Sequence, residues 1–316
     1  MYNCVAEVQM SLSGQGAGGE RANPGASADS PAEAVNFLRV RPSLTTPLSL
    51  DEMTAMAKKL RRHIIRMTGK AGSGHPGGSL SAAEIVTALY FNYLRHDPAN
   101  PGWEGRDRFV LSKGHAAPLL YAALAERGYF DVDELDTLRT LGSCLQGHCD
   151  MTTTLGVEMS SGSLGQGLSF GIGIALAGRL DSRDYRVYVL LGDGECDEGQ
   201  VWEAAMASAH FKLDNLVAII DHNKQQIDGW NRDVMNIEPL AEKWKAFGWH
   251  TIEVDGHELS QLITAFDEAK QVKGRPTAVI AHTIKGKGVS FMENNPDFHG
   301  RAPTAAEVEK ALEELK

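Results

Sequence analysis

The sequence predicts an α/β fold, an open and mostly parallel sheet with helices on both faces, preceded by a disordered N-terminal extension. Continuous apolar runs, such as residues 187–191 and 216–220, are typical of strands that are buried on both faces. Segments of helical composition separate these runs. Strand, helix and strand at this spacing predict parallel pairing, with the helices packed against the sheet.

The first part of the chain differs from the rest in composition. From about residue 11 it is rich in Gly, Ala, Ser and Pro and has no sustained apolar period. Such a segment cannot bury enough apolar surface to offset its loss of conformational entropy. We therefore expect residues 1–47 to be a disordered extension and residues 48–316 to form one domain.

Two helices are expected at the start of this domain. Ser49 and Glu52 match a capping box, and apolar residues follow at helical spacing. This first helix should end at Gly69. A second helix is predicted over residues 81–94, after a Pro-Gly-Gly break at residues 76–78.

The centre of the chain predicts alternating strands and helices. Four strands are expected, over residues 187–191, 216–220, 250–254 and 277–281. Helices are expected over residues 201–211 and 259–272. The apolar segment 164–180 contains Gln166 and five Gly, so it reads as a buried glycine-rich helix rather than a membrane span.

Composition excludes several classes of function. The formal net charge of -10 argues against nucleic acid as the main partner, and no segment predicts membrane insertion. An anionic ligand must therefore be bound by a local feature, such as a metal ion or a helix N-terminus. Four Cys favour a reducing compartment over a disulfide scaffold, and no signal peptide is visible, so a cytoplasmic location is expected.

The strongest chemical signal is an aspartate between two glycines. Gly192, Asp193 and Gly194 follow a predicted strand, and Asn223 lies thirty positions after Asp193, just past the next strand. In parallel sheets, ligands bind at the carboxyl ends of the strands, where these residues would meet. A carboxylate and an amide oxygen suit Mg2+, which also takes oxygen atoms from bound phosphates. Taken alone, a Gly-Asp-Gly sequence more often marks a tight turn than a metal site.

Further motifs change that weighting. Residues 192–194 followed by Asn223 have the spacing of the thiamine diphosphate motif, and residues 221–229 resemble the form found in transketolases. Five more motifs match that family in order and spacing: Gly74-His75-Pro76-Gly77, Lys113-Gly114-His115, Gly147-His148, Gly162-Ser163-Leu164-Gly165 and Phe298-His299-Gly300. The chain thus resembles the N-terminal subunit of a split, two-chain transketolase with the thiamine diphosphate-binding fold.

The resemblance implies cofactors and roles for particular residues. The cofactors are thiamine diphosphate and Mg2+, or Ca2+ or Mn2+ in its place. Asp193, Asn223 and the backbone carbonyl of Gln225 would hold the metal. The cofactor-binding residues would be His115, Gly162, Leu164, Gly192, Asp193, Gly194, Glu198, Asn223 and His299. His75 and His299 would serve donor and acceptor hydroxyls, and His148 a hydroxyl of the transferred two-carbon unit.

The implied reaction moves a two-carbon ketol unit from a ketose phosphate to an aldose or aldose phosphate. The chain lacks the pyrimidine-binding half, so a C-terminal partner subunit is expected, in a heterotetramer with two of each chain. The pentose phosphate exchange is the default among the sugar phosphate substrates, and a specialised sugar pathway stays open.

Three alternatives fit the sequence less well. The alpha chain of a 2-oxo acid dehydrogenase shares Asp193 and Asn223, but residues 73–77 and 162–167 are not expected there together. Deoxyxylulose-phosphate synthase is typically one longer chain. A non-catalytic cofactor-binding module should have lost part of the motif set. Residues 72–77 also fit a dinucleotide-binding pattern, but they follow a helix and not a strand.

Overall fold

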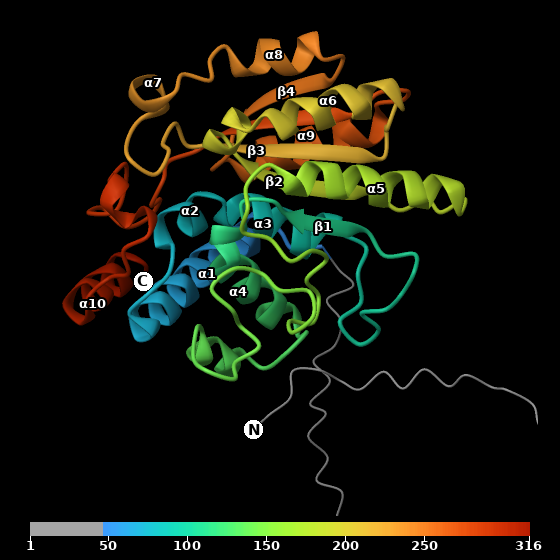
Figure 1. The fold of residues 1–316 in the computed structure, drawn as a ribbon. Coiled ribbons are helices and arrows are strands. Elements are labelled where there is room, and N and C mark those ends of the chain that lie inside the picture. The colour runs from blue at the N-terminus through green and yellow to red at the C-terminus, as the bar shows by residue number, and fades with distance from the viewer. Residues whose placement is uncertain (1–46) are drawn as a thin grey trace, which may run out of the picture.

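The computed structural model describes residues 47–316, and its core is a five-stranded sheet (Figure 1). The extension expected over residues 1–47 lies outside the described residues, apart from residue 47. All strand pairs are parallel, which confirms the predicted sheet, and the strand order is β1-β2-β3-β5-β4. The strands are β1 (Arg108–Leu111), β2 (Val187–Gly192), β3 (Leu216–His222), β4 (His250–Asp255) and β5 (Thr277–His282).

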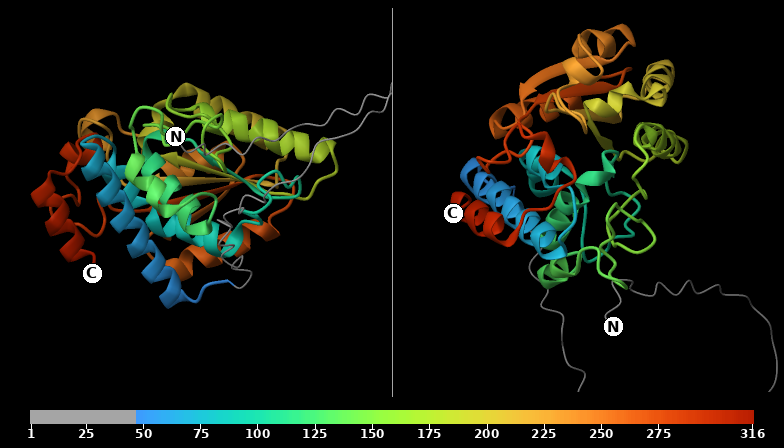
Figure 2. Two further views of the ribbon diagram at one scale, coloured as in Figure 1. Left: turned by 90° about the horizontal axis from the view of Figure 1, so that it is seen from below. Right: turned by 60° about the vertical axis from the view of Figure 1, so that its left-hand side comes forward.

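The central strands are mostly apolar because both of their faces are covered. On β2, Tyr188 and Leu190 belong to one hydrophobic core, whereas Val187 and Val189 belong to a second core on the other face. The first core also holds residues of α1 (Leu50–Ala71), α3 (Ala83–Ala88), α4 (Ala117–Arg127), α9 (Leu259–Gln271) and α10 (Ala305–Glu314). The second holds residues of α5 (Gln166–Leu180), α6 (Gly199–His210) and α8 (Leu240–Ala246). Figure 2 shows these helices on both sides of the sheet.

The first helix begins as predicted and ends later. Ser49 and Glu52 form both bonds of the capping box, but Gly69 lies inside α1, and Gly72 ends the helix with a φ of 59°. Gly69 is needed for packing, because a Cβ atom there would lie 2.3 Å from Val308 Cγ2 on α10. The glycine therefore marks a close helix contact and not a helix end.

The second predicted helix is a chain of shorter pieces that starts earlier. The Pro-Gly-Gly sequence at residues 76–78 opens α2 (Pro76–Ser81) and does not break a helix, because proline is well tolerated at the first helical position. After α3 the chain forms a π-helical turn, Leu89–Tyr93. Gly77 brings α2 close to the 3-10 turn η5 (Pro296–His299), since a Cβ atom there would lie 2.9 Å from the Phe298 carbonyl oxygen.

Two other features differ from expectation. The strand β1, a short edge strand, was not predicted. The helix α5, expected to be buried, has one exposed face that includes Phe170 and Leu180, which is 85% exposed. Within residues 47–316, no helix is long and apolar enough to cross a membrane.

Candidate active site

The ends of β2 and β3 bring the aspartate motif and the asparagine together. Gly192 pairs with Asp221 in the sheet, so Asp193 and Asn223 follow adjacent strand ends, as predicted. A cavity of about 260 Å³ opens at this edge. Of the residues predicted to bind the cofactor or metal, all but Gly162 line it: His115, Leu164, Gly192, Asp193, Gly194, Glu198, Asn223, Gln225 and His299.

Asp193 is a buried carboxylate with only 1% of its surface exposed. One oxygen accepts the Gly194 N–H at 2.8 Å, and the other accepts the Lys224 N–H and, at 2.9 Å, the side-chain amide of Asn231. Burial, and then the nearby Asp221 carboxylate, raise the pKa of Asp193 to about 7. A cation beside Asp193 would supply the positive charge that this carboxylate lacks.

The surrounding amides fit a divalent ion. The Asn231 side-chain oxygen and both polar atoms of the Gln225 side chain are buried without a hydrogen-bond partner among residues 47–316. Buried amides are seldom left unpaired, and oxygen donors next to a carboxylate suit Mg2+. The described part of the chain has no cluster of three or more His, Cys, Asp or Glu placed to hold a metal. An ion here would therefore depend on Asp193, on amide and carbonyl oxygens, and on oxygen atoms of a bound ligand.

Two lysines give the cavity positive charge. The Lys113 ammonium is 1% exposed and bonds to the Asp221 carboxylate and, at 2.9 Å, to the Gly78 carbonyl. The Lys285 ammonium lies 3.1 Å from the Gln226 carbonyl oxygen and 3.0 Å from Nδ1 of His299. Burial and the Lys113 charge lower the pKa of Lys285 to about 8. Neither lysine was given a role from the sequence, although both suit a phosphate group.

A buried glutamate connects the glycine loop to the strand end. Glu195, in the turn η4 (Gly194–Asp197), accepts the N–H groups of Gly165 at 2.9 Å and Gly192 at 3.0 Å, and the Ser112 hydroxyl also donates to it. Glu198, which the resemblance assigns to a support inside the cofactor-binding interface, lines the cavity and is exposed in this chain.

Three other histidine rings cluster around His75. The ring centroid of His75 lies 5.6 Å from that of His115 and 5.5 Å from those of His148 and His299. His115 and His299 line the cavity, whereas His75 and His148 are not among its lining residues. Gly162 does not line the cavity but lies beside the His148 ring. A Cβ atom built on Gly162 would be 3.6 Å from Cγ of His148.

The histidines are neutral near pH 7. Burial, and then Arg139, lower the pKa of His75 to about 4, and burial followed by Lys285 lowers the pKa of His299 to about 3. Burial also lowers the pKa values of His115 and His148. A neutral imidazole has one donor and one acceptor nitrogen, so such a cluster has the chemistry to exchange protons with hydroxyl groups.

Comparison with known proteins identifies the family. Residues 53–315 match the model for the transketolase thiamine diphosphate-binding domain. The chain belongs to the transketolase family. The fold and the ordered motifs of the sequence are those of this family, and the first-ranked interpretation of the sequence is confirmed.

Relatives that this transketolase matches along almost their full length are subunits. It is 47% identical over 265 residues to the 6-deoxy-6-sulfo-D-fructose transketolase subunit of Clostridium sp. (strain MSTE9), covering 84% of this chain and 96% of that protein. It is 42% identical to an apulose-4-phosphate transketolase subunit of Phocaeicola vulgatus, covering 85% of this chain and 95% of that protein. This transketolase is therefore of the N-terminal subunit type.

Longer transketolases contain the same domain. The chain superposes on transketolase from Campylobacter jejuni with a TM-score of 0.80 at 34% identity, covering 85% of this chain and 43% of that one. It is 43% identical to human transketolase and covers 42% of it. The chain thus spans about two fifths of the length of these single-chain relatives.

Proposed function

We propose that this chain and a C-terminal partner subunit together transfer a two-carbon ketol unit from a ketose phosphate to an aldose or aldose phosphate. The observation that carries the proposal is the pair Asp193 and Asn223, at one sheet edge, beside a cavity bordered by lysines and histidines. Thiamine diphosphate, when bound, would supply the carbanion chemistry. A cytoplasmic location is part of the same proposal.

Some of the residues at the cavity would hold the metal, and others would face the phosphate groups of the cofactor. Asp193, Asn223 and the Gln225 carbonyl would hold Mg2+, or Ca2+ or Mn2+ in its place. Lys113 and Lys285 would face the negative charge of the diphosphate, with His115 beside them. Calorimetry of thiamine diphosphate binding to the assembled enzyme, with and without the divalent ion, tests this assignment. Binding that is unaffected by a chelator would contradict it.

The three histidines assigned to catalysis would act on substrate hydroxyls. His75 and His299 are proposed to serve the donor and acceptor, and His148 the hydroxyl of the two-carbon unit. Being neutral, each imidazole has one nitrogen that donates a hydrogen bond and one that accepts it.

Replacing His75 with Ala is expected to lower transfer activity about 100-fold, the usual size of a lost acid–base group, while thiamine diphosphate still binds. Coupled assays and calorimetry measure the two quantities separately. The matched control is H210A, because His210 is exposed at the end of α6 and should leave activity unchanged. Equal activity in H75A and the unmodified enzyme would remove His75 from the mechanism.

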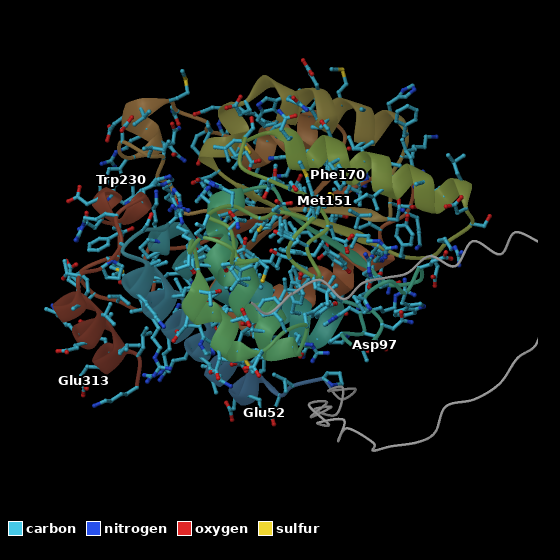
Figure 3. All side chains as sticks on the ribbon, turned by 60° about the horizontal axis from the view of Figure 1, so that its bottom comes forward. Glu52, Asp97, Met151, Phe170, Trp230 and Glu313 are labelled. Atoms are coloured by element: carbon cyan, nitrogen blue, oxygen red, sulfur yellow. The ribbon has the colours of Figure 1, made fainter. Side chains whose placement is uncertain are left out.

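The partner is expected to cover the open side of the cavity. Ile227 and Val234 line the cavity, yet they are 61% and 45% exposed. Phe170 and Met151, labelled in Figure 3, are also exposed apolar residues, at 37% and 50%, but they are not among the residues that line the cavity. Exposed apolar groups around a ligand cavity are typical of a surface that another protein covers.

Size-exclusion chromatography of the chain alone and with its co-expressed partner tests the assembly. We expect a complex with two of each chain and activity only in the mixture. I227E should weaken this complex, whereas L180E should not, because Leu180 ends α5 about 22 Å along the helix from its start at Gln166. Full activity of the chain without a partner would disprove the two-subunit proposal.

The identity of the donor sugar is to be determined by testing candidate donors with the assembled enzyme. The subunits matched along their full length are named for 6-deoxy-6-sulfo-D-fructose and apulose 4-phosphate, which supports testing both beside the pentose phosphates. Pyruvate tests the 2-oxo acid alternative. Cofactor binding without turnover of any donor would favour the non-catalytic module.

A further inference from the structure

One arginine joins the two loops that carry His75 and His148. Arg139 follows the 3-10 turn η3 (Val132–Thr137), and its guanidinium donates to the Ser73 hydroxyl at 2.9 Å and to the Gly147 carbonyl at 3.2 Å. The second of these nitrogens, Nη2, also lies 3.4 Å from Nδ1 of His75. A single planar group thus contacts the His75 ring and the residue before His148.

The position of this guanidinium is fixed by packing. A Cβ atom at Gly147 would lie 2.8 Å from Arg139 Cζ, so a larger residue there would displace the guanidinium. The Arg139 backbone N–H donates to the Leu145 carbonyl at 2.9 Å, which anchors the residue to the same loop. Arg139 has a φ of 60°, an uncommon conformation for a residue with a side chain. The surrounding loop therefore holds Arg139 in a conformation with an intrinsic cost.

We propose that Arg139 is a positioning residue for ketol transfer, which fixes the neutral tautomer of His75 and its placement relative to His148. The inference rests on the proposed function. Guanidinium has donors only, so His75 Nδ1 must be the acceptor, and the ring proton lies on Nε2. The Nε2–H group of His75 then lies beside Gly300. A Cβ atom built on Gly300 would be 3.8 Å from His75 Nε2. An Nε2–H group in this orientation can donate to a substrate hydroxyl oxygen.

The charge of Arg139 acts in the same direction. The charged or titratable groups that face His75 are Arg139 and Lys285, with the rings of His115, His148 and His299. No carboxylate of residues 47–316 is among them, so nothing there favours the imidazolium form. Arg139 also lowers the pKa of His148, after the effect of burial. Its guanidinium therefore helps to keep both histidines unprotonated.

The tautomer can be measured without any catalysis. We expect two-bond 15N–1H correlation spectra of the full chain near pH 7 to show His75 as the Nε2–H tautomer, with its signal assigned from H75A. R139M has no donor or charge and should give a mixture of tautomers. R139K keeps both features and should restore the wild-type tautomer. A wild-type tautomer in folded R139M would overturn the proposal, even if the protein had no transferase activity.

Kinetics of the assembled enzyme give the second measurement. In R139M, kcat/KM should fall by about 10- to 100-fold through misplacement of the histidine. The acid limb of its pH profile should move up by about one pH unit. If R139M does not fold, R139Q replaces it: the amide retains a donor but no charge, so the acid limb must still move. An unchanged acid limb in R139Q would overturn the proposal.

Discussion

Replacing Asp193 with Asn is expected to weaken metal-dependent binding of thiamine diphosphate by about 100-fold or more. Loss of a residue that only supports a metal ligand costs about 10- to 100-fold in affinity, and Asp193 is the carboxylate proposed to touch the metal itself. The side chain is 1% exposed, so solvent cannot replace the lost charge. Calorimetry on the complex of this chain with its partner measures the effect.

The control is a charge change in the same cavity that should not touch the metal. Asp228 also lines the cavity but is exposed, so D228N should leave the affinity nearly unchanged. A stability measurement on D193N without metal shows whether the variant has misfolded. The pKa of Asp193 in the folded chain is about 7, above its ordinary 3.8. Its carboxyl group therefore makes the fold less stable as the pH rises from about 4 to 7 and the group loses its proton. At pH 8, metal-free D193N should therefore be no less stable than the unmodified chain. Equal metal-dependent affinity in D193N and the unmodified protein would reject the metal assignment.

Replacing Lys113 with Met is expected to lower the free energy of unfolding by about 3–5 kcal/mol, because it leaves a buried charge without its partner. The side chains of Lys113 and Asp221 are 1% and 0% exposed. Asp221 would keep three neutral donors: the hydroxyls of Ser81, at 2.5 Å, and Thr283, and the side-chain amide of Asn223, at 3.4 Å. Urea denaturation measures the loss. The double variant K113M/D221N should recover part of it, since the uncompensated charge is then gone.

An exposed ion pair is the matched comparison. The side chains of Lys70 and Asp136, 2.8 Å apart, are both 58% exposed, so K70M should cost less than about 1 kcal/mol. The buried pair also predicts a pH dependence. Burial raises the pKa of Asp221, but Lys113, Ser81 and Thr283 outweigh it and hold that pKa below its ordinary 3.8. The stability from Asp221 is thus present above pH 3.8 and is lost as pH falls below it. A loss in K113M no larger than that in K70M would contradict this account.

Local sequence patterns predict most of the central sheet. The runs at residues 187–191 and 277–281 became β2 and β5 with one residue added, because a strand buried on both faces must be apolar throughout. The strand β1 was missed because its four residues begin with Arg108 and form no long apolar run. The predicted end of α1 was wrong because the role of Gly69 depends on Val308, a residue that is distant in sequence.

The site shows the same division between local and tertiary information. Asp193 and Asn223 could be predicted because each follows a strand that the sequence reveals, and parallel strands end at one edge. Arg139, Glu195 and Asn231 could not be predicted because their roles depend on contacts between loops that are distant in sequence. Glu198 lines the cavity with an exposed side chain, and its role as a support inside the cofactor-binding interface stays a prediction.

The strand order has a consequence for solubility. Because β4 lies at one end of the sheet and β1 at the other, each has one side with no neighbouring strand among residues 47–316. Charged residues on an edge strand discourage a second molecule from adding a strand, and β4 has Glu253 and Asp255 exposed. At the other edge, β1 has only four residues and offers little length for such pairing. Aggregation through sheet extension is thus disfavoured at both edges.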